Sequence, residues 1–167
     1  AYYVPCVSSD YDEIQSRYGA ALNTTTGAVA SPLTLAAKIV MEQGTREMIL
    51  VPTKGSTVTS VTAAQLVAAY ATLDSRDDVG IVVPLTVGIT GTDLSVGDTT
   101  NAATDLKNHV ENASTNGNYR IGIYGLDKGA TRSHDAIATA VASKRVMVVY
   151  PNILNWFNGD INVNSEL

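Results

Sequence analysis

Residues 77–86 read D-D-V-G-I-V-V-P-L-T, and they are followed by D-L-K-N-H-V-E-N-A-S at 105–114 and N-Y-R-I-G-I-Y-G at 118–125. The first stretch holds a continuous run of β-branched residues that Pro84 ends, which predicts a strand covered on both faces. The second carries apolar residues three and four positions apart, the spacing of one helix face. The third returns as a second buried strand. A strand, a helix and a strand in this order predict a parallel crossover unit, with elements at 79–83, 105–113 and 121–124.

Further helices are indicated by the residues that begin and end them. Ser31 followed by Pro32 is a typical helix start, and Gly44 ends that helix. Thr62 and Gln65 have the spacing of a capping box. The sequence therefore predicts helices over 11–18, 31–44 and 62–73, and another that begins at Ser133.

Short apolar runs beside these helices predict the remaining strands, at 2–7, 47–52 and 145–150. Pro5 places the first of them at the edge of a sheet, since proline has no N–H to donate. Because helices and strands alternate with short connections, we predict an α/β fold. More specifically, we expect a three-layer sandwich with a mainly parallel central sheet flanked by helices, in one domain over residues 1–167. A Gly- and Thr-rich loop at 87–100 and a tail at 152–167 show no clear element.

The composition excludes several classes of protein. Hydrophobic residues make up 45% of the chain and charged residues only 16%, a balance expected where surfaces meet other subunits. With 11 Lys and Arg against 16 Asp and Glu, the net charge is −5, and the chain offers no basic stripe for nucleic acid. Cys6 is the one cysteine, so no intrachain disulfide forms.

We expect no membrane span, because no apolar run approaches the roughly 18 to 20 residues required. We also expect no signal peptide, since the start lacks a basic region.

Two patterns of catalytic type occur, and neither has the context that its chemistry needs. Lys-Gly-Ser-Thr at 54–57 resembles part of a phosphate-binding loop, but its lysine precedes the glycine, so we interpret it as a polar turn. Tyr124 and Lys128 have the spacing that short-chain dehydrogenases use on a helix. Here Tyr124 ends a predicted strand, and we do not expect the two side chains to meet. The sequence contains no dinucleotide-binding loop and no nucleophile elbow.

The remaining candidate residues have structural interpretations. His109 lies beside apolar residues on a helix face, which favours a packing role, and His134 lies at a helix start, where it is solvated. Cys6 is far in sequence from both histidines, and three such residues do not make a metal site. The acidic clusters at 77–78 and 10–13 fit turn and capping charges. We therefore assign no catalytic, cofactor-binding or metal-binding residue, and we expect no enzyme activity and no cofactor.

The ordered set of motifs resembles the tail sheath proteins of contractile-tailed bacteriophages. The motifs are S-S-D-Y-D-E-I-Q-S-R-Y-G from residue 8, S-P-L-T-L-A-A-K-I-V-M-E-Q-G from 31, D-D-V-G-I-V-V-P-L-T from 77, L-K-N-H-V-E-N-A-S from 106, N-Y-R-I-G-I-Y-G from 118 and K-R-V-M-V-V-Y-P-N from 144. Together they cover most of the chain, from about residue 8 to 152, and their order and spacing carry the resemblance.

The resemblance implies a structural virion protein. Sheath subunits polymerise around the tail tube and shorten when the baseplate triggers them, which drives the tube through the host envelope. It implies partners among other sheath subunits, tube proteins and baseplate proteins, and a place in the virion tail after assembly in the host cytoplasm. The family's N-terminal arm and tube-facing segments have no counterpart here, so we expect residues 1–167 to be a core fragment of a larger subunit and to be monomeric when isolated.

Two alternatives remain open. The chain is also compatible with a small flavodoxin-like α/β enzyme or nucleotide-binding domain, whose site would lie in the loops after Val51, Val83 and Tyr124, at the carboxyl ends of the strands. It is equally compatible with the sheath of a secretion or injection machine built on the same contractile plan.

Overall fold

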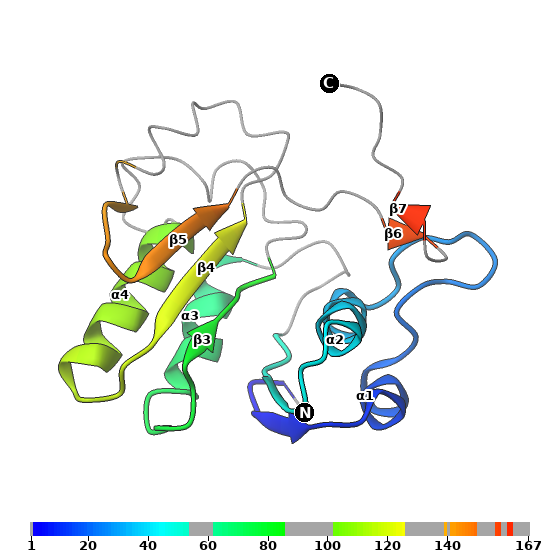
Figure 1. Cartoon of the computed structure of the whole chain (residues 1–167), viewed down its shortest axis with the longest axis horizontal. Coiled ribbons are helices and arrows are strands. Elements are labelled where there is room, and N and C mark those ends of the chain that lie inside the picture. The colour runs from blue at the N-terminus through cyan, green and yellow to red at the C-terminus, as the bar shows by residue number, and fades with distance from the viewer. Residues whose placement is uncertain are drawn as a thin grey trace.

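A computed structural model describes residues 2–53, 62–85, 102–125, 139 and 141–149, together with the backbone of two short strands at Trp156–Phe157 and Asp160–Ile161. Within these residues the protein is a mixed α/β structure (Figure 1). It contains a three-stranded parallel sheet, a two-stranded antiparallel sheet that packs with helices, and a separate two-stranded pair.

Helices α1 (Tyr11–Tyr18) and α2 (Pro32–Glu42) begin at the capping residues that the sequence indicates. The Asp10 carboxylate accepts a hydrogen bond from the backbone N–H of Asp12 at 2.9 Å. Ser31 Oγ accepts one from the N–H of Thr34 at 3.3 Å, with Pro32 in the first turn. Each bond satisfies a donor that a helix start leaves without a partner. Both predicted helices are thereby confirmed.

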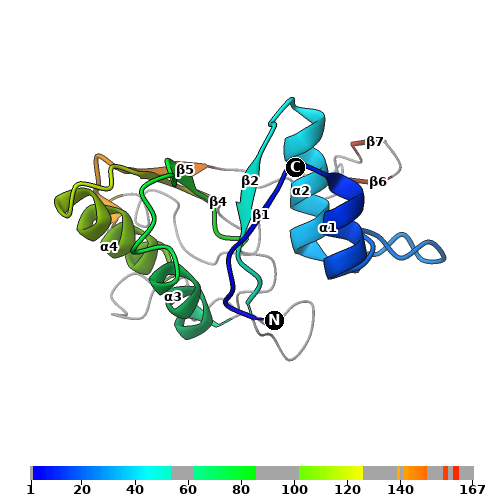
Figure 2. The ribbon, with the colours of Figure 1, turned by 90° about the horizontal axis from the view of Figure 1, so that it is seen from below.

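Strands β1 (Cys6–Ser8) and β2 (Met48–Leu50) pair antiparallel, with Cys6 opposite Leu50. The predicted strands at 2–7 and 47–52 therefore exist but are short, and they do not belong to a parallel sheet. The reason lies in the connection between them. Helices α1 and α2 lie between the two strands and run in opposite directions, so the chain comes back to the carboxyl end of β1 (Figure 2). Strand β2 starts there and therefore runs antiparallel to β1.

The predicted crossover unit is confirmed. Strand β3 (Ile81–Val82), helix α4 (Ala102–Thr115) and strand β4 (Ile121–Gly125) follow one another, and β5 (Val146–Val149) completes a parallel sheet in the order β3-β4-β5. Helix α4 begins three residues before the predicted start. Helix α3 (Ala63–Ala71) precedes β3 and opens with the predicted capping box, in which Thr62 and Gln65 bond to each other's backbone N–H groups.

One face of the parallel sheet packs against α3 and α4, which lie side by side beneath it (Figure 2). The core between them is formed by buried residues from all of these elements, among them Leu66, Tyr70, Val82, Leu106, Val110 and Tyr124. The contact between α4 and β4 is especially close at Gly122. A Cβ atom added there would lie 2.8 Å from the side chain of Leu106.

Strand β2 is shared between two cores. Ile49 and Val51 pack against the core of α3 and α4, whereas Leu50 and Met48 belong to a second cluster with α1 and α2. Figure 2 shows the consequence, with β1 and β2 standing between the two pairs of helices. Strand β2 therefore has α3 and α4 on one side and α1 and α2 on the other.

The tail contains one element that the sequence did not predict. Strands β6 (Trp156–Phe157) and β7 (Asp160–Ile161) form an antiparallel pair, so the prediction of no clear element there is wrong. The sequence between them is Asn-Gly, the usual dipeptide of a two-residue hairpin. The predicted helix from Ser133 falls largely outside the described residues, although Thr139 is helical, and the predicted loop at 87–100 lies wholly outside them.

We predict that Gly122→Ala destabilises the protein by about 1 to 3 kcal/mol, because the new methyl group overlaps Leu106 and α4 must shift or Leu106 must leave its rotamer. Urea unfolding measures the change. Gly80→Ala is the matched control, since a Cβ there has no atom within 4 Å. Equal effects of the two substitutions would contradict the close packing of α4 on β4.

Candidate functional site

The parallel sheet has one face that is largely open. Its side chains alternate between the two faces, and those pointing away from α3 and α4 are all apolar: Ile81, Val83, Ile121, Ile123, Met147 and Val149. Ile81 is 58% exposed, Val83 54% and Met147 59%. We call these six residues the open face. Within the described residues of the single chain, the second face of these strands is therefore not covered as the sequence predicts, because a run of β-branched residues indicates a buried strand without saying what buries it.

The handedness of the connections explains why this face is open. From β3 to β4 and from β4 to β5 the chain steps across the sheet in the same direction. Right-handed crossovers that step in one direction pass over the same face. Helix α4 lies on that face, and Val141, which precedes β5, is buried in the same core. Among the described residues, no helix therefore lies on the opposite face.

The pair α1 and α2 does not extend over the open face. It packs against β1 and β2, and both views place it beside the parallel sheet rather than above it (Figures 1 and 2). The open face therefore begins where this helical layer stops. Parallel sheets in α/β proteins normally have both faces covered, so the open face is a surface that lacks its covering layer.

The edge of the open face carries an aromatic residue and a cation. Tyr119, just before β4, is 72% exposed, and the Arg145 guanidinium lies 5.3 Å from the centre of its ring. This is within the range of a cation–π contact. Tyr, Met and Arg are the residue types that protein–protein interfaces favour, whereas charged residues are depleted from interface centres. The six apolar residues with this edge thus have the composition of an interface rather than of a ligand pocket.

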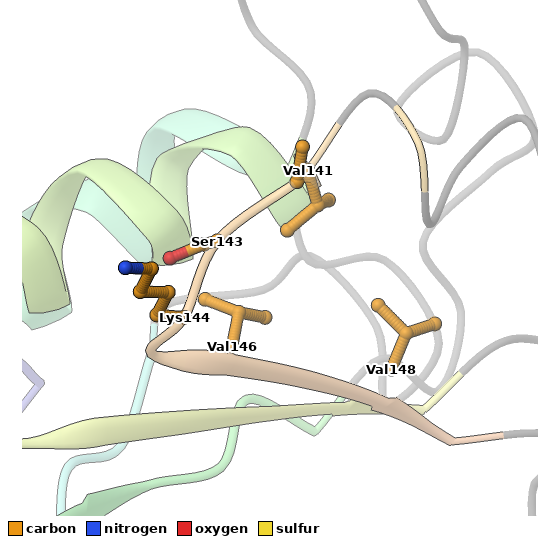
Figure 3. Close-up of a pocket in the computed structure, with 6 residues that line it drawn as sticks. Val141, Ser143, Lys144, Val146 and Val148 are labelled. Atoms are coloured by element: carbon orange, nitrogen blue, oxygen red, sulfur yellow. The ribbon is translucent and has the colours of Figure 1, made fainter.

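A shallow pocket of about 450 Å³ lies on the other side of β5 (Figure 3). Val146 and Val148 point into it from the strand, and Val141, Ser143 and Lys144 come from the preceding segment. The Ser143 hydroxyl donates to Glu111 on α4 at 2.7 Å. The lining is mainly aliphatic, so the pocket offers little to orient a polar substrate.

A buried polar cluster joins α3, α4 and β4. Arg120, one residue before β4, is 1% exposed, and its Nη1 lies 3.0 Å from His109 Nε2. Its Nη2 donates to the carbonyl oxygens of Leu73 at 3.2 Å and Arg76 at 2.7 Å. Both carbonyls belong to the turn that follows α3, which ends at Ala71. Arg120 therefore binds this turn from a distant part of the chain.

His109 lies at the centre of this cluster. Its ring stacks on Tyr70, with centroids 5.0 Å apart, and its Nδ1 lies 3.2 Å from the Asp74 carboxylate. Burial, and then the charge of Arg120, lower the pKa of His109, while Asp74 acts in the opposite direction. Burial also raises the pKa of Tyr70, so its hydroxyl stays neutral. The predicted packing role of His109 is confirmed, and the imidazole is neutral at pH 7.

The other candidates from the sequence occupy separate places. Tyr124 is fully buried on β4, and Lys128 lies outside the described residues, as do Lys54 and His134. Cys6 is buried on β1, with its sulfur facing the Arg17 guanidinium.

The acidic clusters have the structural roles that the sequence indicated. Asp10 caps α1, and Asp78 in the turn before β3 accepts a hydrogen bond from Arg76 Nε at 2.8 Å. Within the part of the chain that the structure describes, no three His, Cys, Asp or Glu residues form a group that could hold a metal ion.

Sequence reasoning missed both the open face and Arg120. A signal for Arg120 was available, since an arginine directly before a buried strand needs acceptors. For the open face, the alternation of exposed and buried positions along β3 to β5 cannot be seen in a sequence where both sets are apolar.

Comparison of the chain with protein-family models, with curated proteins and with solved structures finds no match. Among the described helices, none combines the length and the apolar character needed to cross a membrane.

We predict that Ile81→Asp and Val82→Asp have opposite outcomes, although the two positions are adjacent. Ile81 lies on the open face, so its substitution changes the free energy of unfolding by about 0.5 kcal/mol or less and lowers the binding of an apolar dye. Val82 is 7% exposed and faces α4, so an unpaired carboxylate there prevents folding or costs several kcal/mol. Thermal unfolding and dye fluorescence measure both effects. Comparable damage by both substitutions would mean that the open face is covered within the chain.

Proposed function

We propose that this protein is a structural subunit of a contractile tail sheath, which polymerises around a tail tube and shortens to drive the tube through a host envelope. It would act in the virion tail, with other sheath subunits, tube proteins and baseplate proteins as partners. The observation that carries the proposal is the open face: an apolar sheet surface in a chain whose charged residues amount to 16%.

The physical argument begins with the cost of leaving this face in water. Apolar surface removed from water contributes about 25 cal/mol per Å², so six aliphatic side chains on one face favour association strongly. Contiguous apolar patches on a protein surface are typical of sites that bind another protein. A covering layer supplied by assembly would complete the three-layer sandwich that the sequence predicts. Assembly also agrees with the small number of charged residues, because repulsion between charged surfaces is what keeps many proteins monomeric.

The resemblance to sheath proteins supports the identity of the partner. Its motifs fall on the elements that build the core and the open face: α1, α2, β3, α4, β4 and β5. A mechanical role stores energy in contacts between subunits, and it requires neither a nucleophile nor a nucleotide. The mainly aliphatic pocket beside β5 and the structural roles of Asp10, Asp78 and His109 agree with such a role.

The flavodoxin-like alternative places its site in the loops after β2, β3 and β4. These loops lie at 54–61, 86–100 and 126–138, outside the described residues. The experiment that tests the sheath proposal therefore needs a second measurement that detects a bound small molecule.

We predict that the full-length protein, produced together with the products of its neighbouring genes and purified through a tag, is found in hollow tubes by electron microscopy, in a long and a shortened form. Ile81→Asp should abolish the tubes, because it places a charge at the centre of the open face. Val7→Asp is the control, since Val7 is also exposed but lies on β1.

Native mass spectrometry of the same preparation separates the two functions. Single chains without tubes, each carrying one small molecule of constant mass, would contradict the sheath proposal and favour the flavodoxin-like one. Tubes that form equally well with Ile81→Asp would leave the sheath function standing and remove the open face as its contact surface.

A further inference from the structure

We propose that His109 is an acid-sensitive latch, whose neutral imidazole holds Arg120 in place and whose protonation frees the turn at 74–78 from α4 and β4. The proposal rests on the geometry of the buried cluster and holds whether or not the protein is a sheath subunit.

Hydrogen-bond chemistry decides which nitrogen of His109 carries the proton. The Arg120 guanidinium has donors and no acceptor, so at 3.0 Å from Nη1 the Nε2 atom must accept. The proton of the neutral ring is therefore on Nδ1, which donates to the Asp74 carboxylate at 3.2 Å. Both ring nitrogens are thus used, one as an acceptor and one as a donor, and the neutral tautomer is the form that satisfies both partners.

Protonation breaks this arrangement at one point. A hydrogen on Nε2 would face the N–H groups of Arg120, so two donors and two positive charges would meet about 3 Å apart with no acceptor between them. Arg120 cannot give up its own proton at any ordinary pH. One of the two cations must therefore move, or the surrounding structure must open.

The charged groups around His109 do not cancel this repulsion. Asp74 is the nearest carboxylate, but its side chain is 66% exposed, so water screens it. Tyr70 contributes a neutral ring from α3, and Asp105 lies one turn earlier on α4 itself. Asp78 comes from the same turn as Asp74, and Arg76 already engages it in a two-point contact.

Release of Arg120 would loosen a defined part of the molecule. Its Nη2 binds the carbonyls of Leu73 and Arg76, and Asn118 Nδ2 donates to the carbonyl of Asp74 at 3.2 Å. These bonds attach the turn before β3 to the segment before β4. Immediately beyond them, the N–H of Ile121 donates to the carbonyl of Gly80 at 2.9 Å, which begins the pairing of β3 with β4. The His109 cluster therefore lies at the amino ends of β3 and β4, next to the first residues of the open face.

The direction of the pH dependence follows from the lowered pKa of His109 in the folded protein. The unfolded chain binds the proton with an ordinary pKa of about 6.5, whereas the folded protein resists it. The stabilising effect is therefore complete above about pH 6.5 and is lost as the pH falls below that value, until the lower folded pKa is reached.

Nitrogen-detected NMR of the histidine rings in the unmodified protein tests the latch directly. At pH 7.5 we expect the His109 ring to be neutral with its proton on Nδ1, and to titrate below the ordinary histidine value of about 6.5. A neutral ring with its proton on Nε2, or titration of His109 at or above that ordinary value, would overturn the proposal.

Urea unfolding at pH 7.5 and pH 5.5 supplies an independent test with matched variants. An unfolded pKa of about 6.5 limits the effect of one histidine on the folding equilibrium constant to about tenfold between these two pH values. We expect this constant to fall on acidification by up to about tenfold more in the unmodified protein than in His109→Gln. His134→Gln should behave like the unmodified protein. Glutamine can accept from Arg120 and donate to Asp74 without titrating. An equal fall in all three proteins would show that His109 contributes no acid sensitivity.

Discussion

The packing of α3 and α4 on one face of the parallel sheet governs both the core and the exposed surface of the described structure. Helix α4 connects β3 to β4 across that face, and Val141, just before β5, is buried in the same core. That face acquires a full core, in which Leu106 sits directly on Gly122. The other face presents six apolar side chains, and none of the described helices covers them. The close packing of one face and the exposure of the other thus follow from the placement of α3 and α4 on the same side of the sheet.

The open face and the buried polar cluster are linked through the amino ends of β3 and β4. Arg120 and Ile121 are adjacent, so the residue that binds the turn after α3 immediately precedes the first residue of β4 on the open face. A buried arginine is tolerated because Leu73, Arg76 and His109 supply acceptors to it.

Local elements could be predicted from the sequence, and long-range arrangements could not. Ser31 before Pro32, and Thr62 with Gln65, determine helix starts through contacts within three residues, and both predictions are confirmed. The antiparallel pairing of β1 with β2 depends on how α1 and α2 pack, which no local pattern contains. Similarly, the bond from Arg120 to Leu73 joins residues that are 47 positions apart. The pair β6–β7 is different, since its Asn-Gly dipeptide is a local signal that the sequence does contain.

Exposure of the open face is tested most directly by the rate at which dilute peroxide oxidises each of the three methionines, followed by mass spectrometry. Met147 is 59% exposed on the open face, whereas Met41 and Met48 pack against the cluster of α1, α2 and β2. In the isolated chain we predict that Met147 is oxidised well before the other two. In assembled particles we predict that Met147 becomes protected while Met41 and Met48 change little. If Met147 is already as slow as Met48 in the isolated chain, the sheet has no open face.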